Sequence, residues 1–481
     1  MGEDVHSVVI LFTYTFGVAS LSMGHVFAAT GPVVGSILLY LLSAGNLHAS
    51  ALLAKCMALA PSTVQSFGDL GQHACGSFGR YAILISESLS CLLTPIAFLV
   101  LGGTQLLPSI ASYWGLPHYE STTWIILFAL GMLPIIYIPT LKETVVLCVI
   151  GSLATFFTDS VGVYVNLNDH PMAFRETAVT ARGAVSAYGT IMFAFGTALL
   201  IPPLHRQRAD SSPDQLVALL SMTMVAITCL YIMIGSATYF QFGCTAPATL
   251  LESMPRGLPK ATATAAMLVH ISVAYPVIMS PTLFVIERHL FGTVGADPDH
   301  LPPQVGESGV ALLGHNVPAS PSDDVDGLHT YKSVDDAPEK AAEAVAKDSG
   351  VLSRRDYACR LLLRTGVVAA QCFVAVMLQA SFADILTLIG AMTVTLPCMI
   401  MPCVCHLRMV QRDGTWLGCF SRAMSIGVIA ASAVMGVYST VEAIRNIQST
   451  AATFHLFQPA SHRAFVDGAA QFPYCAVGEQ N

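Results

Sequence analysis

Four small or polar side chains, Thr13, Gly17, Ser20 and Gly24, are spaced by four, three and four residues within the first apolar run of the chain. This spacing places them on one face of a helix. Two glycines and two serines within eight residues also weaken a helix there. A broken helix in lipid exposes backbone N–H and C=O groups, which a buried polar ligand can satisfy. The run therefore predicts ligand binding by the main chain, with close packing between helices as the alternative.

A second apolar run, five spans later, has the same character. Ser186, Thr190, Phe193 and Thr197 share a helical face. The following Pro202 and Pro203 are expected to end the helix early. Interrupted helices at matching positions in two halves of a membrane protein are the best sequence indication of a transport site.

The composition places these runs in a membrane protein. Of 481 residues, 54% are hydrophobic and 11% charged, with a mean hydropathy of +0.63, whereas soluble proteins carry about 25% charged residues. The net charge is −8 and comes from 292–353, which hold 11 acidic and 3 basic residues. An ordinary soluble enzyme is therefore excluded, and nucleic-acid binding is not expected.

A bilayer core needs about 20 mostly apolar residues for each helix. Lipid cannot satisfy uncovered strands, so we expect an all-α polytopic membrane protein with about eleven spans. The expected spans are 8–29, 33–60, 81–110, 123–139, 144–165, 185–204, 216–240, 261–286, 359–380, 384–406 and 419–444.

The distribution of Lys and Arg orients these spans. With the N-terminus in the cytosol, the inner segments outside the acidic insert hold 13 of these residues and the outer segments 6. Residues 1–7 are then a short cytosolic N-terminus, 8–291 hold helices one to eight, 354–444 hold helices nine to eleven, and 445–481 form an extracytosolic tail. Residues 292–353 are expected to be an acidic, disordered cytosolic loop, either a linker or a regulatory segment.

The 13 cysteines lie mostly in apolar runs and do not indicate a disulfide scaffold. Cys244 and Cys475 both fall in segments expected outside, so one disulfide is compatible with this topology. No metal site is expected from the cysteines near 398–406, because helical residues two apart point to different sides.

Six weak motifs occur in order between residues 8 and 444, and together they form a specific set. They are 17–31; 66–71 followed by 78–80; 189–195 with Pro202; 239–243 with 250–255; Tyr275 and Pro276 with Pro281, Ile286 and Glu287; and 382–391. In this set the sequence resembles the amino acid/auxin permease family of the amino acid–polyamine–organocation superfamily. The second motif matches that family's loop before the third span.

This resemblance implies a leucine-transporter-type 5+5 inverted repeat, with the first and sixth helices unwound around an amino acid. It also implies coupling to protons, or to sodium in some members. The sequence departs from the family pattern at Ala19, at Gly24 and His25, and at Thr197 and Ala198. The substrate identity therefore does not carry over.

Half-helix termini can bind a zwitterion without a charged side chain. Free N–H groups suit its carboxylate and free carbonyls suit its ammonium. Because the spans contain few charges, we expect a neutral substrate side chain. The expected residues are Gly17, Val18, Ala19 and Ser20 for the carboxylate, Phe193, Ala194 and Phe195 for the ammonium, and Gly196 and Thr197 for the side-chain pocket.

Ion coupling needs a group that titrates or coordinates an ion within the membrane. A structural role with satisfied packing is the alternative for each such residue. The candidates for proton coupling are Asp159, His25, Glu87 and His270. The candidate oxygen ligands for sodium are Thr13, Thr15, Ser272 and Ser280.

The sequence thus predicts a secondary active transporter of amino acids in the lipid bilayer, not an enzyme, and without a cofactor. The plasma membrane is the expected location, with a vacuolar or lysosomal membrane as the alternative. The alternative function is an amino-acid sensor that signals through 292–353.

Overall fold

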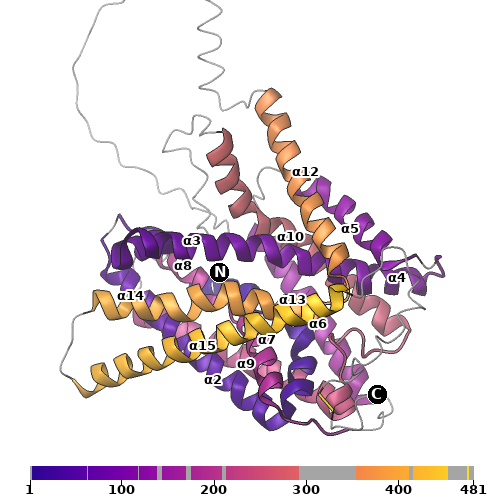
Figure 1. Ribbon diagram of the computed structural model, residues 1–481, viewed down its shortest axis with the longest axis horizontal. Helices are drawn as coiled ribbons and strands as arrows, with labels where there is room; N and C mark the ends of the chain where they lie inside the picture. The colour runs from indigo at the N-terminus through magenta and orange to yellow at the C-terminus, as the bar shows by residue number, and fades with distance from the viewer. Residues whose placement is uncertain are drawn as a thin grey trace, which may run out of the picture.

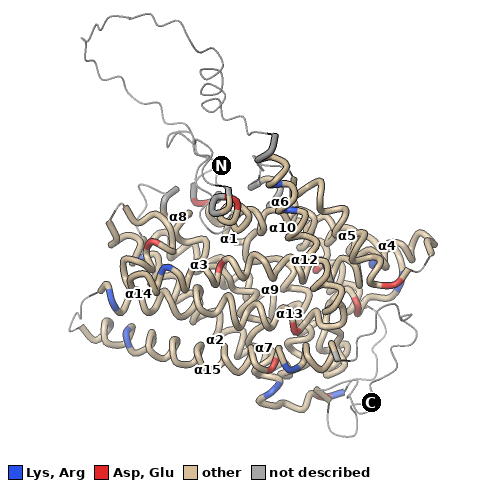
Figure 2. The backbone as a smooth tube through the Cα atoms, turned by 45° about the horizontal axis from the view of Figure 1, so that its top comes forward, with Lys and Arg blue, Asp and Glu red and all other residues tan. Residues whose placement is uncertain are grey.

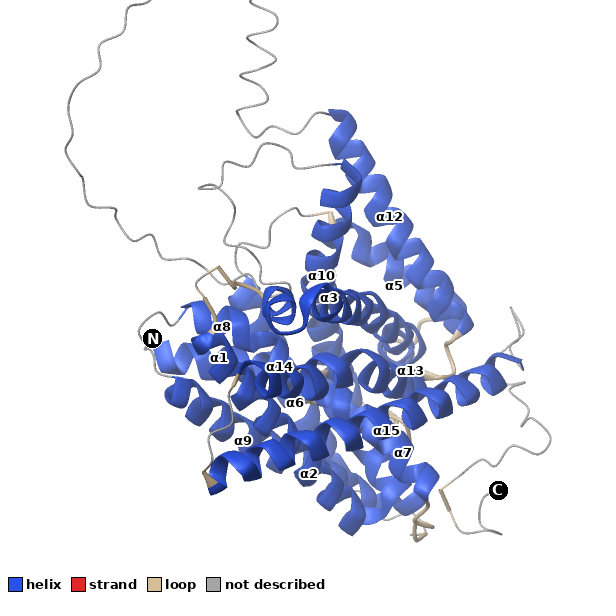
Figure 3. Cartoon of the chain, turned by 60° about the vertical axis from the view of Figure 1, so that its left-hand side comes forward, coloured by secondary structure: helices blue, strands red, loops and turns tan. Residues whose placement is uncertain are grey.

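The computed structural model of the chain is built from helices (Figures 1 and 3). It describes residues 3–61, 63–117, 119–137, 144–168, 175–207, 213–291, 354–410, 415–452 and 474–475. Among these residues, β pairing is limited to one bridge between Thr177 and Cys475. The expected all-α class is therefore confirmed. The acidic insert 292–353 lies outside the described residues, so the expectation of a disordered loop stays a prediction.

The helices of the first half are α1 Glu3–Thr15, the 3-10 turn η1 Val18–Ser22, α2 Met23–Leu59, α3 Phe67–Leu101, the π-helical turn η2 Gly102–Leu106, α4 Leu107–Tyr113, α5 Ser121–Ile136 and α6 Thr144–Asn168. The helices that follow are α7 Ala181–Ala194, the 3-10 turn η3 Thr197–Leu200, α8 Ile201–Gln207, α9 Pro213–Phe242, the short turn η4 Gly243–Thr245 and α10 Leu258–Phe291. The last are α12 Arg354–Met377, α13 Phe382–Ile389, the π-helical turns η6 Gly390–Val394 and η7 Leu396–Ile400, α14 Met401–Met409 and α15 Trp416–Ala452.

Seven of the described helices are long and apolar enough to cross a membrane. An eighth is added if the pair Phe382–Val394 and Leu396–Met409, bent by 41°, forms one span. The backbone tube carries few charged positions along its length (Figure 2). The chain is thus a multi-pass integral membrane protein. Each of the eleven expected ranges contains helix, but the number of eleven spans stays a prediction.

The first two expected spans share α2, which is broken at Gly31. This residue has a φ of 73° and precedes Pro32. Gly35 and Phe27 lie on either side of this break and are close together, since a Cβ atom on Gly35 would lie 3.3 Å from the Phe27 ring. In a straight helix, two residues eight positions apart would be separated by about 12 Å along the axis. The chain therefore turns back at this glycine, as the boundary between two spans requires.

The segment expected as a loop before the third span is instead a helical hairpin at the start of α3. Ser66 caps its first arm, because the Asp69 N–H donates to the Ser66 hydroxyl over 3.1 Å and the Asp69 carboxylate accepts from the Ser66 N–H over 3.1 Å. Gly76, at a φ of 67°, turns the chain. Gly71 and Gly79 let the two arms touch, since a Cβ atom on Gly71 would lie 2.8 Å from the Gly79 carbonyl oxygen.

The break in the sixth span is located differently from the expectation. Helix α7 ends at Ala194, and η3 separates it from α8. Pro202 and Pro203 lie in the first turn of α8, where a missing backbone N–H leaves no helical hydrogen bond unmade. The expectation that these prolines end a helix is therefore wrong, because they begin one.

Cys244 in η4 and Cys475 in the tail form a disulfide, with their Cα atoms 5.2 Å apart. The Ala178 N–H donates to the Tyr474 carbonyl over 2.9 Å, so this part of the tail is fixed against the segment before α7. The pairing considered from the sequence is confirmed.

Helix α7 is packed on several sides by α2, α13, α15 and η6. Its side chains Tyr188, Ile191 and Met192 are buried. Gly189 touches Gly390 of η6 so closely that a Cβ atom on Gly390 would meet the Gly189 carbonyl oxygen. This close approach fixes the position of α7, whose end forms part of the site described below.

We expect Gly390→Val to lower the free energy of unfolding by roughly 3 kcal/mol, because the added methyl groups force the two helices apart. Gly427→Val in α15 is the matched control, since a Cβ atom there would meet no atom within 4 Å. The measurement is the fraction of detergent-solubilised protein that stays monodisperse after heating. An equal loss of monodisperse protein in the two variants would contradict the close packing of Gly189 against Gly390.

Candidate functional site

A cavity of about 180 Å³ lies between α1, η1, α3, α6, α7, η3 and α10. A single water needs roughly 15 Å³ of such space, so the cavity has room for a small organic molecule. Both interrupted segments contribute to its wall. The lining residues used below are Thr13, Tyr14, Thr15, Gly17, Val18, Ala19, Glu87, Ser90, Cys91, Thr94, Phe193, Gly196 and His270.

The first break presents its backbone to this cavity. Gly17 is extended, with φ −151° and ψ −150°, and η1 begins at Val18. The first residues of a helical turn have no partner for their N–H groups within the turn. Gly17, Val18 and Ala19 line the cavity, whereas the Ser20 hydroxyl donates back to the Gly17 carbonyl over 2.9 Å.

Side chains from other helices bind the carbonyls at the end of α1. The Tyr231 hydroxyl donates to the Thr15 carbonyl over 2.8 Å, and the Ser152 hydroxyl donates to the Thr13 carbonyl over 3.4 Å. These bonds replace helical hydrogen bonds that the break removes. The interruption is thus supported by α6 and α9.

The second break is held by Asn46 of α2. Its amide nitrogen donates to the Phe195 carbonyl over 2.7 Å, and its amide oxygen accepts from the Thr197 hydroxyl over 2.6 Å. Phe195 and Thr197 are fully buried and do not line the cavity, and neither does the buried Ala194. Phe193 and Gly196 do line it. Sequence reasoning missed Asn46, although an asparagine within an apolar run is a recognisable signal.

His270 of α10 lies against the first break. Its Nδ1 atom is 2.9 Å from the Gly151 carbonyl of α6, and since a carbonyl only accepts, Nδ1 carries the proton. Its Nε2 atom lies 3.5 Å from where a Cβ atom of Gly17 would be. Nε2 is therefore the nitrogen that accepts a hydrogen bond or a second proton beside Gly17.

Helix α3 contributes a polar stripe to the cavity. Glu87, Ser90, Cys91 and Thr94 all line it, at spacings that keep them on one helical face. Glu87 is 3% exposed. The structure thus brings a carboxylate to the wall of the cavity.

The remaining coupling candidates lie elsewhere. Asp159 of α6 is buried beside Ser20 and outside the cavity lining. The His25 ring packs 5.4 Å from the Tyr474 ring, near the disulfide-linked tail. Ser272 is partly buried in α10 and is also outside the lining.

Of the sodium-ligand candidates, Thr13 and Thr15 reach the cavity. The Thr15 hydroxyl donates to the Leu11 carbonyl over 2.8 Å. The Ser280 hydroxyl donates to the Val277 carbonyl over 2.9 Å. Both hydroxyls are thus bound within their own helices, and Ser272 and Ser280 do not line the cavity that Thr13 and Thr15 reach.

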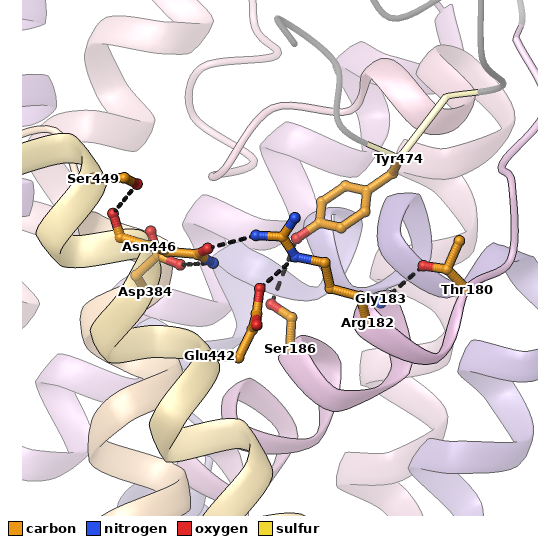
Figure 4. Close-up of polar contacts among 9 residues, drawn as sticks. All are labelled: Thr180, Arg182, Gly183, Ser186, Asp384, Glu442, Asn446, Ser449 and Tyr474. Carbon is orange, nitrogen blue, oxygen red and sulfur yellow. Dashed lines mark hydrogen bonds and ion pairs between the residues drawn. The ribbon is translucent and has the colours of Figure 1, made fainter. Parts of the chain in front are cut away.

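A polar network connects the start of α7 to two other helices (Figure 4). Arg182 forms an ion pair with Glu442 of α15 and donates to Asn446 over 2.9 Å. Asn446 donates to Asp384 at the start of α13 over 2.9 Å. This network lies on the side predicted to be extracytosolic, and sequence reasoning did not identify it.

The chain is similar to one protein family, to two curated relatives and to one solved structure. The family described as "transmembrane amino acid transporter protein" matches residues 4–445. Amino acid transporter AVT1J of Arabidopsis thaliana is 22% identical over 448 residues, and the match covers 90% of this chain and 88% of that protein. Amino acid transporter AVT3B of the same organism is 23% identical over 297 residues, and the match covers 58% of this chain and 70% of that protein. The solved structure of Mhp1, a nucleobase-cation-symport-1 family transporter with bromovinylhydantoin bound, has a TM-score of 0.39 and 12% identity, covering 96% of this chain and 95% of its own.

We expect Thr197→Val to lower the free energy of unfolding by about 1–3 kcal/mol, because the buried Asn46 amide loses a hydrogen-bond donor. Thr262→Val is the matched control. Its hydroxyl bonds only to carbonyls of its own helix, Leu258 and Pro259, on an exposed surface. Thermal unfolding in detergent measures both. A variant at Thr197 that unfolds at the wild-type temperature would show that Asn46 does not support the break.

Proposed function

The chain belongs to the transmembrane amino acid transporter family, and from this membership we propose a proton-coupled secondary transporter of amino acids that alternates access around its two broken helices. The family consists of transporters, so the chain is not an enzyme. The observation that carries the proposal is a single cavity lined by both breaks, at Gly17 and at Gly196.

The carboxylate of the substrate binds at the start of η1. Gly17, Val18 and Ala19 line the cavity there. The first N–H groups of a helical turn have no partner within the turn, and its N-terminus carries partial positive charge. Binding by the main chain avoids burying a charged side chain in the membrane. Ser20 supports this turn from behind rather than contacting the substrate, because its hydroxyl is bound to the Gly17 carbonyl.

The ammonium binds at the end of α7. Carbonyls at a helix C-terminus carry partial negative charge, and Phe193 and Gly196 bring this end of α7 to the cavity. The Phe195 carbonyl and the Thr197 hydroxyl hold the break through Asn46. We therefore assign Phe195, Ala194 and Thr197 to support of the site, and Phe193 and Gly196 to the substrate.

A neutral side chain fits most of the remaining wall. Val18, Phe98, Leu199, Val273 and Val394 all line the cavity. Apolar lining with a few placed polar groups is typical of small-molecule sites. These residues support neutral amino acids as substrates.

Proton coupling is assigned to His270. A proton on its Nε2 atom adds an N–H donor and a positive charge beside the substrate carboxylate at Gly17. The proton and the substrate then strengthen each other's binding by the same free energy, as thermodynamic linkage requires. Asp159 and His25 do not share this arrangement with the substrate, because neither lines the cavity.

For the host membrane, we propose the plasma membrane, with a vacuolar or lysosomal membrane as the alternative. The Cys244–Cys475 disulfide lies on the side predicted to be extracytosolic. Disulfides persist in oxidising compartments such as the cell exterior, which supports a membrane with one face outside the cytosol.

Tracer uptake into liposomes tests the proposal. We expect uptake of at least one of the twenty amino acids to rise about five- to tenfold when the outside is acidified, a size typical of coupling between two ligands. His270→Gln should abolish this rise, since glutamine can still donate to the Gly151 carbonyl but does not titrate in this range. His48→Gln, whose histidine bonds to Ser425 outside the cavity over 3.1 Å, should behave as wild type. Absence of any uptake would refute the function, and a retained rise in His270→Gln would refute the coupling site.

We also expect Gly17→Leu to abolish uptake in a protein that still folds. The added side chain would fill the cavity beside His270, whose ring lies 3.5 Å from the Cβ position. Gly427→Leu, on a surface without neighbours, is the control for the helix itself. Uptake and size-exclusion profiles are measured together, and normal uptake by Gly17→Leu would place the substrate elsewhere.

A further inference from the structure

The cavity extends from the two breaks toward the side predicted to be cytosolic. Val9 and Ile10 of α1 line it, about two helical turns before the first break. Among the described residues, none of α2 lines the cavity, and α7 contributes Phe193 at its inner end. The start of α2 and the length of α7 are the outer parts of the two broken spans, so the cavity does not extend outward between them. Access from outside requires the start of α7 to move away from its neighbours.

The start of α7 is held to two neighbouring helices by the polar network of Figure 4. Arg182 forms an ion pair with Glu442 of α15 and donates to the side-chain oxygen of Asn446 over 2.9 Å. The Asn446 amide nitrogen donates to the Asp384 carboxylate of α13 over 2.9 Å. One arginine thus connects α7 to α15 and, through Asn446, to α13.

Two further contacts hold α7 in place beside this network. About two turns further along α7, the Thr190 hydroxyl lies 3.0 Å from the Thr387 hydroxyl of α13. The Tyr474 hydroxyl donates to the Ser186 hydroxyl of α7 over 3.5 Å, and the disulfide of the next residue, Cys475, anchors that tyrosine. Separation of α7 from α13 would therefore break the arginine network and expose the threonine pair beneath it.

We propose that Arg182 is a latch on the outer side of the transporter. Its network holds α7 against α13 and α15 while the cavity extends toward the cytosol, and it releases before the substrate site opens outward. This inference rests on the proposed function, because it assigns the latch to one step of alternating access. The Arg182 side chain is 67% exposed, so its ion pair is weak enough to break and re-form in each transport cycle.

The first test does not require transport. Thr387→Cys places a thiol at the α7–α13 interface, where the wild-type side chain is 2% exposed. In detergent-solubilised protein, the rate of maleimide labelling above that of the parent's own cysteines then measures how often the interface opens. Adding Arg182→Gln should raise this rate about two- to fivefold, the range expected for loss of an exposed ion pair. Adding Arg445→Gln, which changes an exposed arginine of α15 outside the network, should leave it unchanged. An unchanged rate with Arg182→Gln would overturn the latch.

A double-mutant cycle separates the latch from general loosening of the helices. Glu442→Gln should raise the labelling rate as Arg182→Gln does. The double variant should be no faster than the faster single one, because both substitutions remove the same ion pair. Effects that multiply in the double variant would indicate two independent losses and would contradict the latch.

Transport kinetics test the assigned step. Uptake is measured in liposomes in which the predicted outer side faces out. Arg182→Gln should lower the KM for the external amino acid by about the same factor as it raises labelling, because a larger fraction of the protein then exposes its site outward. A variant that is only less stable loses maximal rate without a lower KM, so an unchanged or higher KM would overturn the latch. Absence of uptake by the wild-type protein would instead refute the proposed function and the transport step assigned to Arg182, whereas the labelling rates would still show whether Arg182 holds α7 against α13.

Discussion

In a bilayer, a polar backbone group that leaves its helix must find a partner within the protein. This requirement governs the two interrupted segments of this chain. At each break some of the freed groups are bound by side chains of other helices, Tyr231 at the first and Asn46 at the second. Those bonds support the two breaks, and residues from both breaks line one cavity.

The groups that support the breaks and the groups proposed to bind the substrate are therefore adjacent but distinct. Asn46 occupies the Phe195 carbonyl and the Thr197 hydroxyl, and Phe193 and Gly196 on either side reach the cavity. In the first break the Ser20 hydroxyl donates back to the Gly17 carbonyl, and Gly17, Val18 and Ala19 line the cavity. The two ring nitrogens of His270 divide support and function in the same way. His270 is oriented by Gly151 of another helix, and that bond directs its free nitrogen toward the site.

The first interruption could be predicted from the sequence, because glycines and serines close together inside an apolar run weaken the helix at that point. The second was expected from Pro202 and Pro203, whereas the chain breaks before them, at the end of α7. The boundaries of the second interruption could not be predicted. Whether Pro202 ends or begins a helix depends on where the chain has broken before it. The rotation of each helix about its axis was also beyond the sequence. Asp159 and Glu87 are both acids within apolar spans, and only the packing of α3 and α6 decides that Glu87 reaches the cavity. The expected topology made a Cys244–Cys475 disulfide possible, but topology alone does not place the two cysteines within bonding distance, as the structure does.

We propose that the main chain at the two breaks binds one zwitterion. A cryo-electron-microscopy map of the protein in lipid nanodiscs with a transported amino acid tests it most directly. We expect density for the ligand between Gly17 and Gly196, with its carboxylate toward the start of η1 and its ammonium toward the end of α7. Ligand density away from both breaks, or unbroken helices through residues 15–23 and 194–201, would contradict it.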